Sequence, residues 1–314
     1  MFTRIHENGE KEKKKTLKSV NWHCFKACNY ACEFCYARFA ELMTAPFMAE
    51  NEGYKLLDQL ADAGVEKVNF VGGEPMLHPH IEAWIIYAKK LDMVTSIVSN
   101  GTKIDEDFLN RIASSLDWVG LSVDASNDKL HAKLGRGLRR EISKGISNHL
   151  TRSLAIAKLL QNYDVGIKLN TVVTSLNCND DMTSIVKQIN PDRWKIFQVL
   201  GIEGENDDEI EKLSIDQNIF EAYVDYHKQQ LQNLSEITII GEDNDVMLGS
   251  YAMIDPIGRV YTNKNGGYKY SENTVLEIGF QKAWNQVSCG FDENRFHQRN
   301  GDWDWNRETI GGEA

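Results

Sequence analysis

The feature of this chain that most constrains its fold is the regular alternation of short apolar runs with helix-like stretches. Strands are predicted at residues 19–25, 68–71, 94–99, 119–123, 165–173 and 194–200. Helices are predicted between them, at residues 49–63, 81–90, 105–115, 142–161 and 180–188. Such alternation is typical of βαβ units, whose strands form a parallel sheet. We therefore expect an α/β protein whose chemistry lies near the carboxyl ends of the strands.

Three cysteines follow the first predicted strand at a spacing suited to an iron–sulfur cluster. Cys28, Cys32 and Cys35 share one short loop, and Phe34 directly precedes the last of them. Thiolates are the usual ligands of such clusters, and three of them leave one iron of a [4Fe–4S] cluster open for chemistry. A structural zinc site normally needs four protein ligands, and only Cys24 lies nearby to complete a set. Disulfides fit poorly, because four cysteines crowd into residues 24–35.

Composition limits the class of protein. The 314 residues are 42% hydrophobic, enough for one large α/β domain with an appendage or for two domains. A net charge of −11 argues against a nucleic-acid binder, which would present a basic face. No apolar run approaches the roughly 18 residues of a membrane helix. We therefore expect a soluble protein that binds neither nucleic acid nor membrane. Free cysteines and an oxygen-sensitive cluster both favour the reducing cytoplasm.

Basic residues occur inside two of the predicted strands. Lys168 and Asn170 share one strand face by the period-two rule, and Arg193 and Lys195 share a face of the next strand. A lysine inside a barrel strand is costly unless it meets an anion, although an outward-facing edge strand would also explain it. Three cations on neighbouring strands would suit a triphosphate.

Glycine-rich and polar turns follow several of the predicted strands. Two glycines let a backbone approach a ligand closely, and a following glutamate can accept from an ammonium group, although Gly-Gly-Glu also occurs in ordinary turns. An arginine between glycines suits carboxylate recognition, whereas Asn-Gly and Asp commonly form turns and helix caps. The turns in question contain Gly72, Gly73, Glu74 and Pro75, then Ser99 and Asn100, then Ser122 and Asp124, and finally Arg136.

A CxxxCxxC motif with an aromatic residue before its last cysteine, followed one βα unit later by Gly-Gly-Glu-Pro, closely resembles the signature of the radical S-adenosylmethionine (SAM) enzymes. The resemblance implies a partial (β/α)6 barrel in which three cysteines hold a [4Fe–4S] cluster. SAM would chelate the open iron and yield a 5′-deoxyadenosyl radical that abstracts hydrogen. By this resemblance the cofactor-binding residues are Tyr30, Phe34, Gly72, Gly73, Glu74, Pro75, Ser99, Asn100, Ser122, Asp124 and Arg136.

The chain also resembles a narrower family, the viperins, and in particular their prokaryotic members. The matching segments include residues 19–23 (SVNWH), 168–172 (KLNTV), 190–198 (NPDRWKIFQ) and 202–206 (IEGEN). Viperins are antiviral enzymes that convert a ribonucleoside triphosphate to its 3′-deoxy-3′,4′-didehydro analogue, a terminator of RNA synthesis. The resemblance implies that this chain takes the 4′ hydrogen from CTP, UTP or GTP, and that the 3′ hydroxyl leaves as water.

The viperin resemblance assigns further roles. It implies that Tyr251 is a catalytic residue and a candidate for the final hydrogen donor, although a packed tyrosine is an equal alternative. It implies a flavodoxin- or ferredoxin-type electron donor and a nucleotide kinase as partners. The polar start differs from the amphipathic membrane helix of the animal proteins, and residues 36–38 differ as well, which leaves the base open. The implied substrate-binding residues are Asn21, Arg38, Lys168, Asn170, Arg193, Lys195 and Lys264, the last in a lid.

The predicted domain plan has three parts. Residues 1–18 form a polar tail, residues 19–202 the core barrel, and residues 203–314 an α+β C-terminal extension that closes the barrel mouth, beginning with an acidic helix near residues 215–231. The alternative enzyme is a peptide-modifying radical SAM protein, but those usually carry auxiliary clusters, and only Cys178 and Cys289 lie beyond the first cluster. A catalytically idle iron–sulfur or zinc protein would need neither Glu74 nor cations inside its strands.

Overall fold

The computed structural model describes residues 17–301, so most of the predicted tail and the end of the predicted extension lie outside the described residues. The strands are β1 (Ser19–Phe25), β2 (Lys67–Gly72), β3 (Val94–Ser99), β4 (Trp118–Ser122), β5 (Gly166–Val173), β6 (Arg193–Gln198), β7 (Thr238–Glu242), β8 (Met253–Ile254), β9 (Arg259–Thr262) and β10 (Lys269–Thr274). The helices are α1 (Glu50–Asp62), α2 (Ile81–Lys90), α3 (Glu106–Ile112), α4 (Asp128–Lys133), α5 (Arg139–Ile142), α6 (His149–Leu160), α7 (Thr183–Ile189), α8 (Asp207–Leu213), α9 (Gln217–Gln230), α10 (Asn244–Met247), α11 (Val275–Ile278), α12 (Phe280–Val287) and α13 (Glu293–Gln298), with 3₁₀ turns at Ala40–Leu42, Pro75–Leu77, Ala113–Ser115 and Ser288–Gly290.

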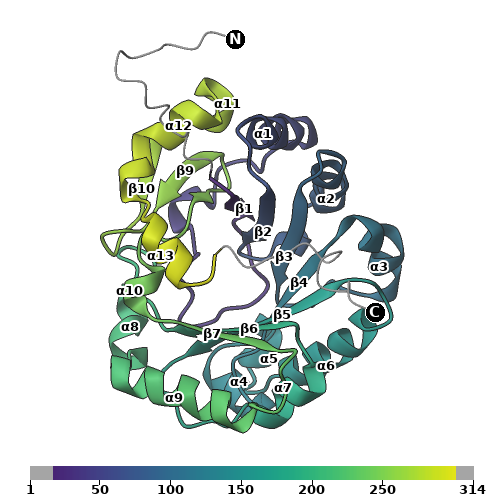
Figure 1. Ribbon diagram of the computed structural model, residues 1–314, viewed down its shortest axis with the longest axis vertical. Coiled ribbons are helices and arrows are strands. Elements are labelled where there is room, and N and C mark those ends of the chain that lie inside the picture. The colour runs from purple at the N-terminus through teal and green to yellow at the C-terminus, as the bar shows by residue number, and fades with distance from the viewer. Residues whose placement is uncertain (1–16, 302–314) are drawn as a thin grey trace.

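All ten strands belong to one sheet, in the order β10-β9-β8-β1-β2-β3-β4-β5-β6-β7. Strands β1 to β7 run parallel, whereas β8, β9 and β10 form antiparallel pairs beside β1. The sheet curves into an incomplete ring with helices on its outer face (Figure 1). Its edges, β7 and β10, do not pair with each other in the described chain, so the barrel is open. The predicted six-unit partial barrel is confirmed.

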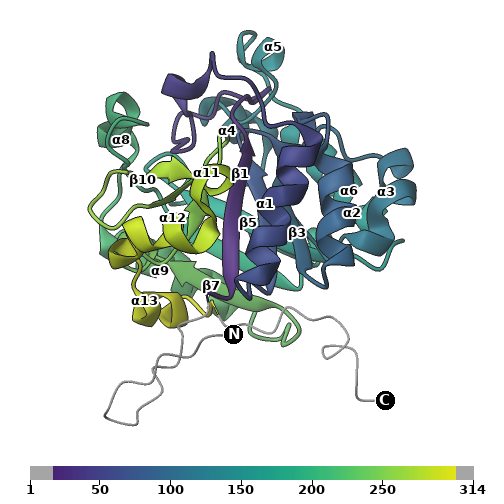
Figure 2. The same cartoon turned by 90° about the horizontal axis from the view of Figure 1, so that it is seen from above.

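The C-terminal extension takes part in the sheet, which the sequence did not indicate. It supplies β7 at one edge, next to β6, and β8 at the other, next to β1. In side view, α13 lies at the end of the barrel where the parallel strands begin, opposite the loops that follow the strands (Figure 2). The extension therefore walls the gap between β1 and β6 and covers the amino ends of the strands.

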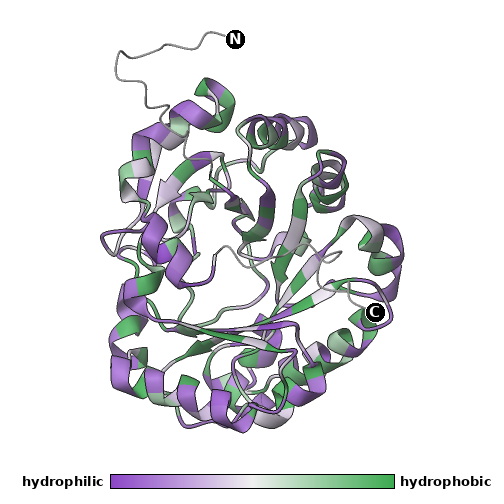
Figure 3. Cartoon of the chain, in the orientation of Figure 1, coloured by the Kyte–Doolittle hydropathy of each residue, from purple (hydrophilic) through white to green (hydrophobic). Residues whose placement is uncertain are grey.

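The period-two pattern divides each central strand between two environments. In β1, Val20, Trp22 and Cys24 are buried in the core beneath the helices. Trp22 stacks on Trp84 of α2 with ring centroids 4.6 Å apart. Gly53 of α1 leaves room for this indole, because a Cβ there would lie 2.2 Å from Trp84. In Figure 3 hydrophobic (green) and hydrophilic (purple) residues are interspersed along the surrounding helices, as expected for helices with one buried and one exposed face.

One predicted helix was wrong over its first half. The helix expected at residues 142–161 begins only at His149, and the preceding stretch forms the short α5 and a turn. Gly145 adopts a left-handed conformation (φ 69°), which ends α5. The Ser147 hydroxyl then accepts a hydrogen bond from His149 N at 3.1 Å, which starts the new helix. No helix within residues 17–301 has both the length and the apolar character needed to cross a bilayer.

Candidate active site

A single cavity of about 280 Å³ runs inside the curved sheet and collects almost every predicted site residue. Its lining comes from the loops that follow β1 to β4, from the inward faces of β1, β2, β5 and β6, and from the C-terminal extension. The predicted residues that line it are Asn21, Cys28, Tyr30, Cys32, Phe34, Cys35, Gly72, Gly73, Glu74, Ser99, Asn100, Ser122, Asp124, Arg136, Lys168, Asn170, Arg193, Lys195 and Tyr251.

Three predicted residues are not part of this lining. Pro75 is buried directly after Glu74 and begins a 3₁₀ turn. Arg38 is exposed, and its guanidinium donates to Glu33 O at 2.8 Å. Lys264 is exposed as well, and its ammonium donates to Cys289 O at 3.4 Å. Contact of Arg38 and Lys264 with a substrate stays a prediction without geometric support in this structure.

The cysteine loop fits a cluster better than a single metal ion. Cys28, Cys32 and Cys35 are free thiols that line the cavity. Within residues 17–301, no three His, Cys, Asp or Glu side chains converge closely enough to hold one metal ion. A structural zinc ion requires such convergence, whereas in a [4Fe–4S] cluster each thiolate binds a different iron. Cys24 cannot complete a set, because it is buried in the core on the other face of β1.

The thiols lie in a strongly desolvated setting. Burial raises the pKa of Cys28 to about 11 and that of Cys32 to about 12, and it also raises the pKa of Cys35. Arg136 opposes this rise at all three cysteines. Loading of iron must therefore displace protons from these thiols, and Arg136 is the nearby cation that favours their thiolate form.

The Gly-Gly-Glu turn is joined to the cysteine loop by its backbone. Gly73 N donates to Phe25 O at 2.6 Å, and Glu74 N donates to Ala27 O at 2.9 Å. A Cβ on Gly73 would lie 2.5 Å from Ala27 O, so only glycine fits here. The sequence suggested that these glycines admit a ligand, and the structure shows that they also admit the start of the cysteine loop.

Glu74 is a buried carboxylate held in a fixed orientation. Its oxygens accept from Ser99 Oγ at 2.7 Å, Asn100 N at 2.8 Å and Met76 N at 3.1 Å. Burial raises its pKa to about 7, although the bonds from Asn100 and Ser99 favour the charged form. An ammonium group entering the cavity would restore the charge that burial disfavours.

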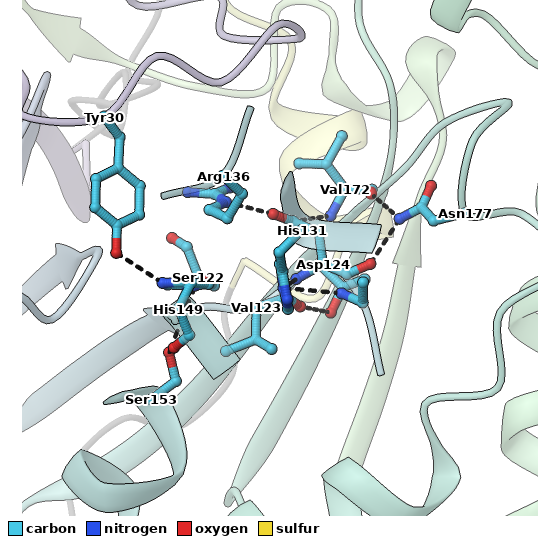
Figure 4. Close-up of polar contacts among 12 residues, drawn as sticks. Tyr30, Ser122, Val123, Asp124, His131, Arg136, His149, Ser153, Val172 and Asn177 are labelled. Carbon is cyan, nitrogen blue, oxygen red and sulfur yellow. Dashed lines mark hydrogen bonds and ion pairs between the residues drawn. The ribbon is translucent and has the colours of Figure 1, made fainter. Parts of the chain in front are cut away.

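A polar network fixes the ends of β4 and β5 beside the cysteine loop (Figure 4). Arg136 Nε donates to Asp124 Oδ2 at 2.5 Å, and Val172 N donates to Asp124 Oδ1 at 2.9 Å. The guanidinium also lies over the Phe34 ring, with 5.2 Å between Cζ and the centroid. Asn177 Nδ2 ties the two strand ends by donating to Asp124 O and to Val172 O.

Two buried histidines complete this network. His149 donates from Nε2 to Ser122 O at 2.6 Å, so its Nδ1 accepts from the Tyr30 hydroxyl at 3.0 Å. His131 Nε2 accepts from the backbone of Asp124 at 3.2 Å and of the following residue at 3.1 Å. Burial lowers the pKa of His131 to about 4 and that of His149 well below its ordinary value. Both imidazoles are therefore neutral, and Tyr30 anchors the cysteine loop to β4 through His149.

Cations gather in the other half of the cavity, toward the amino ends of the strands. Lys168 of β5 lies directly opposite Arg193 of β6, and Asn170 lies opposite Lys195. Both Lys168 and Arg193 are buried. Burial, together with Lys67 and Arg193, lowers the pKa of Lys168 well below its ordinary value. Such a cluster is costly in the free protein and favours the arrival of an anion.

Lys195 forms a close ion pair with an acidic side chain of β7. Its ammonium lies 2.6 Å from Glu242 Oε1 and donates to the Tyr251 hydroxyl at 3.0 Å, and that hydroxyl donates to Glu242 Oε2. Burial lowers the pKa of Lys195 to about 7, although Glu242 opposes this. Burial alone would raise the pKa of Glu242, but Lys195 and Arg299 outweigh it and hold that pKa below its usual value. The Arg299 guanidinium lies 3.9 Å from the centroid of the Tyr251 ring.

Between the two halves lie side chains suited to a sugar. Asn69 of β2 pairs in register with Asn21 of β1, and Asn69 Nδ2 donates to Asn21 Oδ1 at 3.1 Å. Among the described residues, neither Asn69 Oδ1 nor His23 Nδ1 has a hydrogen-bond partner. Burial lowers the pKa of His23 to about 3, so this imidazole is neutral. Hydroxyl groups are the natural partners of such atoms.

Sequence reasoning missed His23, His131 and His149 of this site, and it also missed four charged or amide residues. Lys67 and Asn69 share an inward face of β2, and the period-two rule that identified Lys168 would have identified them. Arg299 follows α13, and Glu242 ends β7 behind the cavity wall. Neither carries a local signal, because their positions depend on how the extension packs.

The chain is similar to known proteins in both sequence and fold. A model of the radical SAM superfamily matches residues 22–189. An S-adenosylmethionine-dependent nucleotide dehydratase of Flammeovirga pacifica is 36% identical over 295 residues, covering 92% of this chain and 96% of that protein. This chain is a member of the radical SAM nucleotide dehydratase family. The family also includes S-adenosylmethionine-dependent nucleotide dehydratase RSAD2 of Siniperca chuatsi, 32% identical over 94% of this chain and 81% of that protein.

Membership of the nucleotide dehydratases confirms the predicted superfamily and family. Among solved structures, Streptococcus suis SuiB bound to S-adenosylmethionine has a TM-score of 0.69 over 90% of this chain and 67% of that one. At 17% identity this likeness concerns the fold alone. The fold is thus that of a radical SAM enzyme, and the dehydratase assignment rests on the sequence relatives.

Proposed function

We propose that this chain is a radical SAM nucleotide dehydratase that converts a ribonucleoside triphosphate to its 3′-deoxy-3′,4′-didehydro analogue. The observation that carries the proposal is the two-ended cavity. Free thiols and a buried carboxylate occupy the carboxyl ends of the strands, and buried cations occupy the amino halves. On β2 the two ends are separated by the run from Lys67 to Gly72, a rise of about 16 Å.

At the carboxyl end, Cys28, Cys32 and Cys35 would ligate a [4Fe–4S] cluster, and Glu74 would accept from the SAM ammonium group. Cluster and SAM, when bound, supply the species that abstracts a hydrogen atom. Ser99 and the backbone of Asn100 hold the Glu74 carboxylate in one orientation. Ser122, Asp124 and Arg136 would bind the SAM carboxylate and ribose. Their positions in the cavity lining near the strand ends support this assignment. The glycines and aromatic residues of the predicted set shape the space around them.

At the amino end, Lys67, Lys168, Arg193 and Arg299 would bind the triphosphate. All four line the cavity, and Lys168, Arg193 and Arg299 are buried. The charged groups that most affect the pKa of Lys168 are the other cations, Lys67, Arg193 and Lys195. Asn170 lies opposite Lys195 and would help to orient the phosphates. This placement puts the ribose beside Asn21 and Asn69, between the phosphates and the abstracting species.

Tyr251 would finish the reaction by donating a hydrogen atom. Its hydroxyl lines the cavity and donates to Glu242, while Lys195 donates to it. A hydrogen donor must stay protonated until it reacts, and burial raises the pKa of Tyr251 well above its usual value. The paired Lys195 therefore serves Tyr251 as much as it serves the phosphates.

The product would lack a 3′ hydroxyl and so would terminate RNA synthesis, which suits an antiviral role like that of the viperins. The reaction needs a low-potential electron donor of flavodoxin or ferredoxin type. A nucleotide kinase is the expected supplier of the triphosphate. All six cysteines are free thiols, and this suits a reducing compartment such as the cytoplasm.

The test is an anaerobic turnover experiment. Reconstituted protein is incubated with SAM, dithionite and each of CTP, UTP, GTP and ATP, and the products are read by mass spectrometry. We expect 5′-deoxyadenosine and, with one nucleotide, an equal amount of a product lighter by one water. If SAM were cleaved but no nucleotide stimulated the cleavage, the dehydratase proposal would be contradicted and the peptide-modifying alternative would be favoured.

A further inference from the structure

The segment that packs against the cysteine loop is strongly basic, in contrast to the chain as a whole. Six of the residues from 129 to 144 are Lys or Arg and one is Glu, a net charge of +5 in a chain whose total is −11. Of these seven, Arg136 and Glu141 are buried, and each forms an ion pair. The others are exposed, namely Lys129, Lys133, Arg139, Arg140 and Lys144.

This basic segment is in direct contact with the loop that carries the thiols. Glu33 N donates to Leu134 O at 3.2 Å, and Arg139 N donates to Asn29 O at 3.2 Å. A Cβ on Gly135, at φ 68°, would lie 2.5 Å from Ala31 O, so the backbone of the basic segment approaches the cysteine loop too closely for any residue other than glycine. In side view α5 forms the tip of the molecule at the end where the cysteine loop lies (Figure 2). The exposed cations therefore lie on a segment that directly contacts the cysteine loop.

An apolar residue lies among these cations. Ile146 is 50% exposed, and it follows Lys144 by two residues. Its amide donates to Glu141 O at 3.2 Å, which holds it beside α5. An apolar centre with a charged rim is the usual anatomy of a transient protein interface.

We propose that Lys133, Arg139, Arg140, Lys144 and Ile146 form the docking face for an acidic one-electron carrier protein. The proposal rests on the proposed function, which requires one electron at the cluster for each SAM cleaved. At this face the reduced carrier gives one electron to the cluster and is itself oxidised by one electron, and no bond forms or breaks. Complementary charge would speed the encounter and orient the carrier toward the cysteine loop.

The buried neighbours explain why this face is rigid. Glu141 accepts two hydrogen bonds from Arg152, at 2.7 and 2.9 Å, and Arg152 donates onward to the Tyr30 hydroxyl at 2.9 Å. The α5 turn is thus joined through Arg152 to the residue that anchors the cysteine loop. A rigid face at a fixed distance from the cluster is what repeated electron transfer needs.

The test compares Arg139→Glu/Arg140→Glu with the wild-type holoenzyme. Both substitutions fall in the first turn of α5, where glutamate is favourable, so folding should be retained. Arg139→Lys/Arg140→Lys keeps the charge. Lys228→Glu/Lys282→Glu reverses two exposed cations of α9 and α12 and is the matched control.

Two readouts are used. Isothermal titration with an oxidised acidic flavodoxin gives the Kd at about 20 mM and about 300 mM salt. Stopped-flow absorbance gives the rate at which the reduced flavodoxin is oxidised by the enzyme. We expect the Glu variant to bind at least about tenfold more weakly at low salt, to lose most of the salt dependence and to slow electron transfer in proportion. The Lys variant and the α9/α12 control should match the wild type.

Dithionite-driven turnover separates this inference from the proposed function. The Glu variant should retain wild-type turnover with dithionite, because a small reductant needs no docking face. If none of the proteins dehydrated a nucleotide with dithionite, the proposed function would be overturned. The flavodoxin Kd values would still test the docking face in that case. Equal flavodoxin affinity of the wild type and the Glu variant at low salt would overturn the proposed docking face. So would binding of anionic lipid vesicles that the Glu substitutions abolish while flavodoxin binding is unchanged.

Discussion

Replacement of Lys195 by methionine should destabilise the protein, because it leaves a buried carboxylate without its closest cation. Glu242 is fully buried, and the Lys195 ammonium lies 2.6 Å from its Oε1. Removal of one partner from a buried ion pair typically costs about 3–5 kcal/mol. Arg299 still favours the charge of Glu242, so we expect the low end, about 3 kcal/mol. In a chain of this size that lowers the Tm by about 4–6 °C.

A double-mutant cycle isolates the pair. Glu242→Gln alone should cost less, about 1–2 kcal/mol, because Lys195 with a pKa near 7 can lose its proton cheaply and glutamine can still accept from Tyr251. Lys195→Met/Glu242→Gln removes both charges and should recover most of the loss. The coupling between the two sites should therefore be about 3 kcal/mol. Urea unfolding of nucleotide-free protein, followed anaerobically by tryptophan fluorescence at equal iron content, measures all four forms.

Lys168→Met is the contrasting variant in the same cavity. The groups that most affect the pKa of Lys168 are burial and the cations around it, so removal of its charge should raise the stability of the free protein. The same change should weaken triphosphate binding by about 1.5–3 kcal/mol, the loss of one charge-assisted contact. If Lys195→Met matched the wild type within about 1 kcal/mol, or if the double variant were no more stable than Lys195→Met, the ion-pair reasoning would be refuted.

Three further predictions concern the cofactors and pH. Cys32→Ala should abolish the visible absorbance of the cluster and all SAM cleavage, whereas Cys24→Ser, on the core face of β1, should keep both. Glu74→Gln should weaken SAM binding by about 10–100-fold in equilibrium dialysis, since it removes a charged acceptor, while iron content stays constant. Burial lowers the pKa of Lys195 to about 7, and a bound triphosphate raises it again, so binding takes up a proton above pH 7. Nucleotide affinity should therefore fall by about 3–10-fold from pH 7.5 to 8.5, and Lys195→Met should flatten that dependence. A slope of opposite sign would contradict this assignment.

Much of the site was predictable because it depends on local patterns. In a parallel sheet every strand ends at the same edge, so motifs that directly follow strands are brought together by topology alone. This explains why Cys28, Glu74, Ser99 and Ser122 line one cavity although they are far apart in the chain. The period-two rule likewise placed Lys168 and Asn170 on the inward face of β5, away from the core residues between them.

The rest depends on long-range packing that no local pattern encodes. Glu242 reaches Lys195 because β7 pairs with β6, although residues 199–237 separate them. Arg299 reaches the Tyr251 ring because α13 folds back under the barrel. The helix predicted at residues 142–161 failed for a local reason, since Gly145 adopts a left-handed conformation in the middle of an apolar pattern. A glycine in such a pattern can be tolerated or can end a helix, and the sequence alone does not decide between them.

The cations of the cavity lie at one end and the thiols at the other, and this separation keeps the two proposed ligands, the triphosphate and SAM, in different places. A triphosphate requires permanent cations, yet cations beside the thiols would hold the anionic SAM carboxylate and the nucleotide at the same place. The sheet keeps the two groups of residues at opposite ends of its strands. Among the described residues, Arg136 is the one Lys or Arg that lines the carboxyl end of the cavity, and it forms an ion pair with Asp124. The other cations lie one strand length away, and there Glu242 forms an ion pair with Lys195, which also donates to the Tyr251 hydroxyl. A fully acidic exterior would repel the acidic electron carrier that we propose, and the basic segment beside the cysteine loop would offset that repulsion at the proposed docking face.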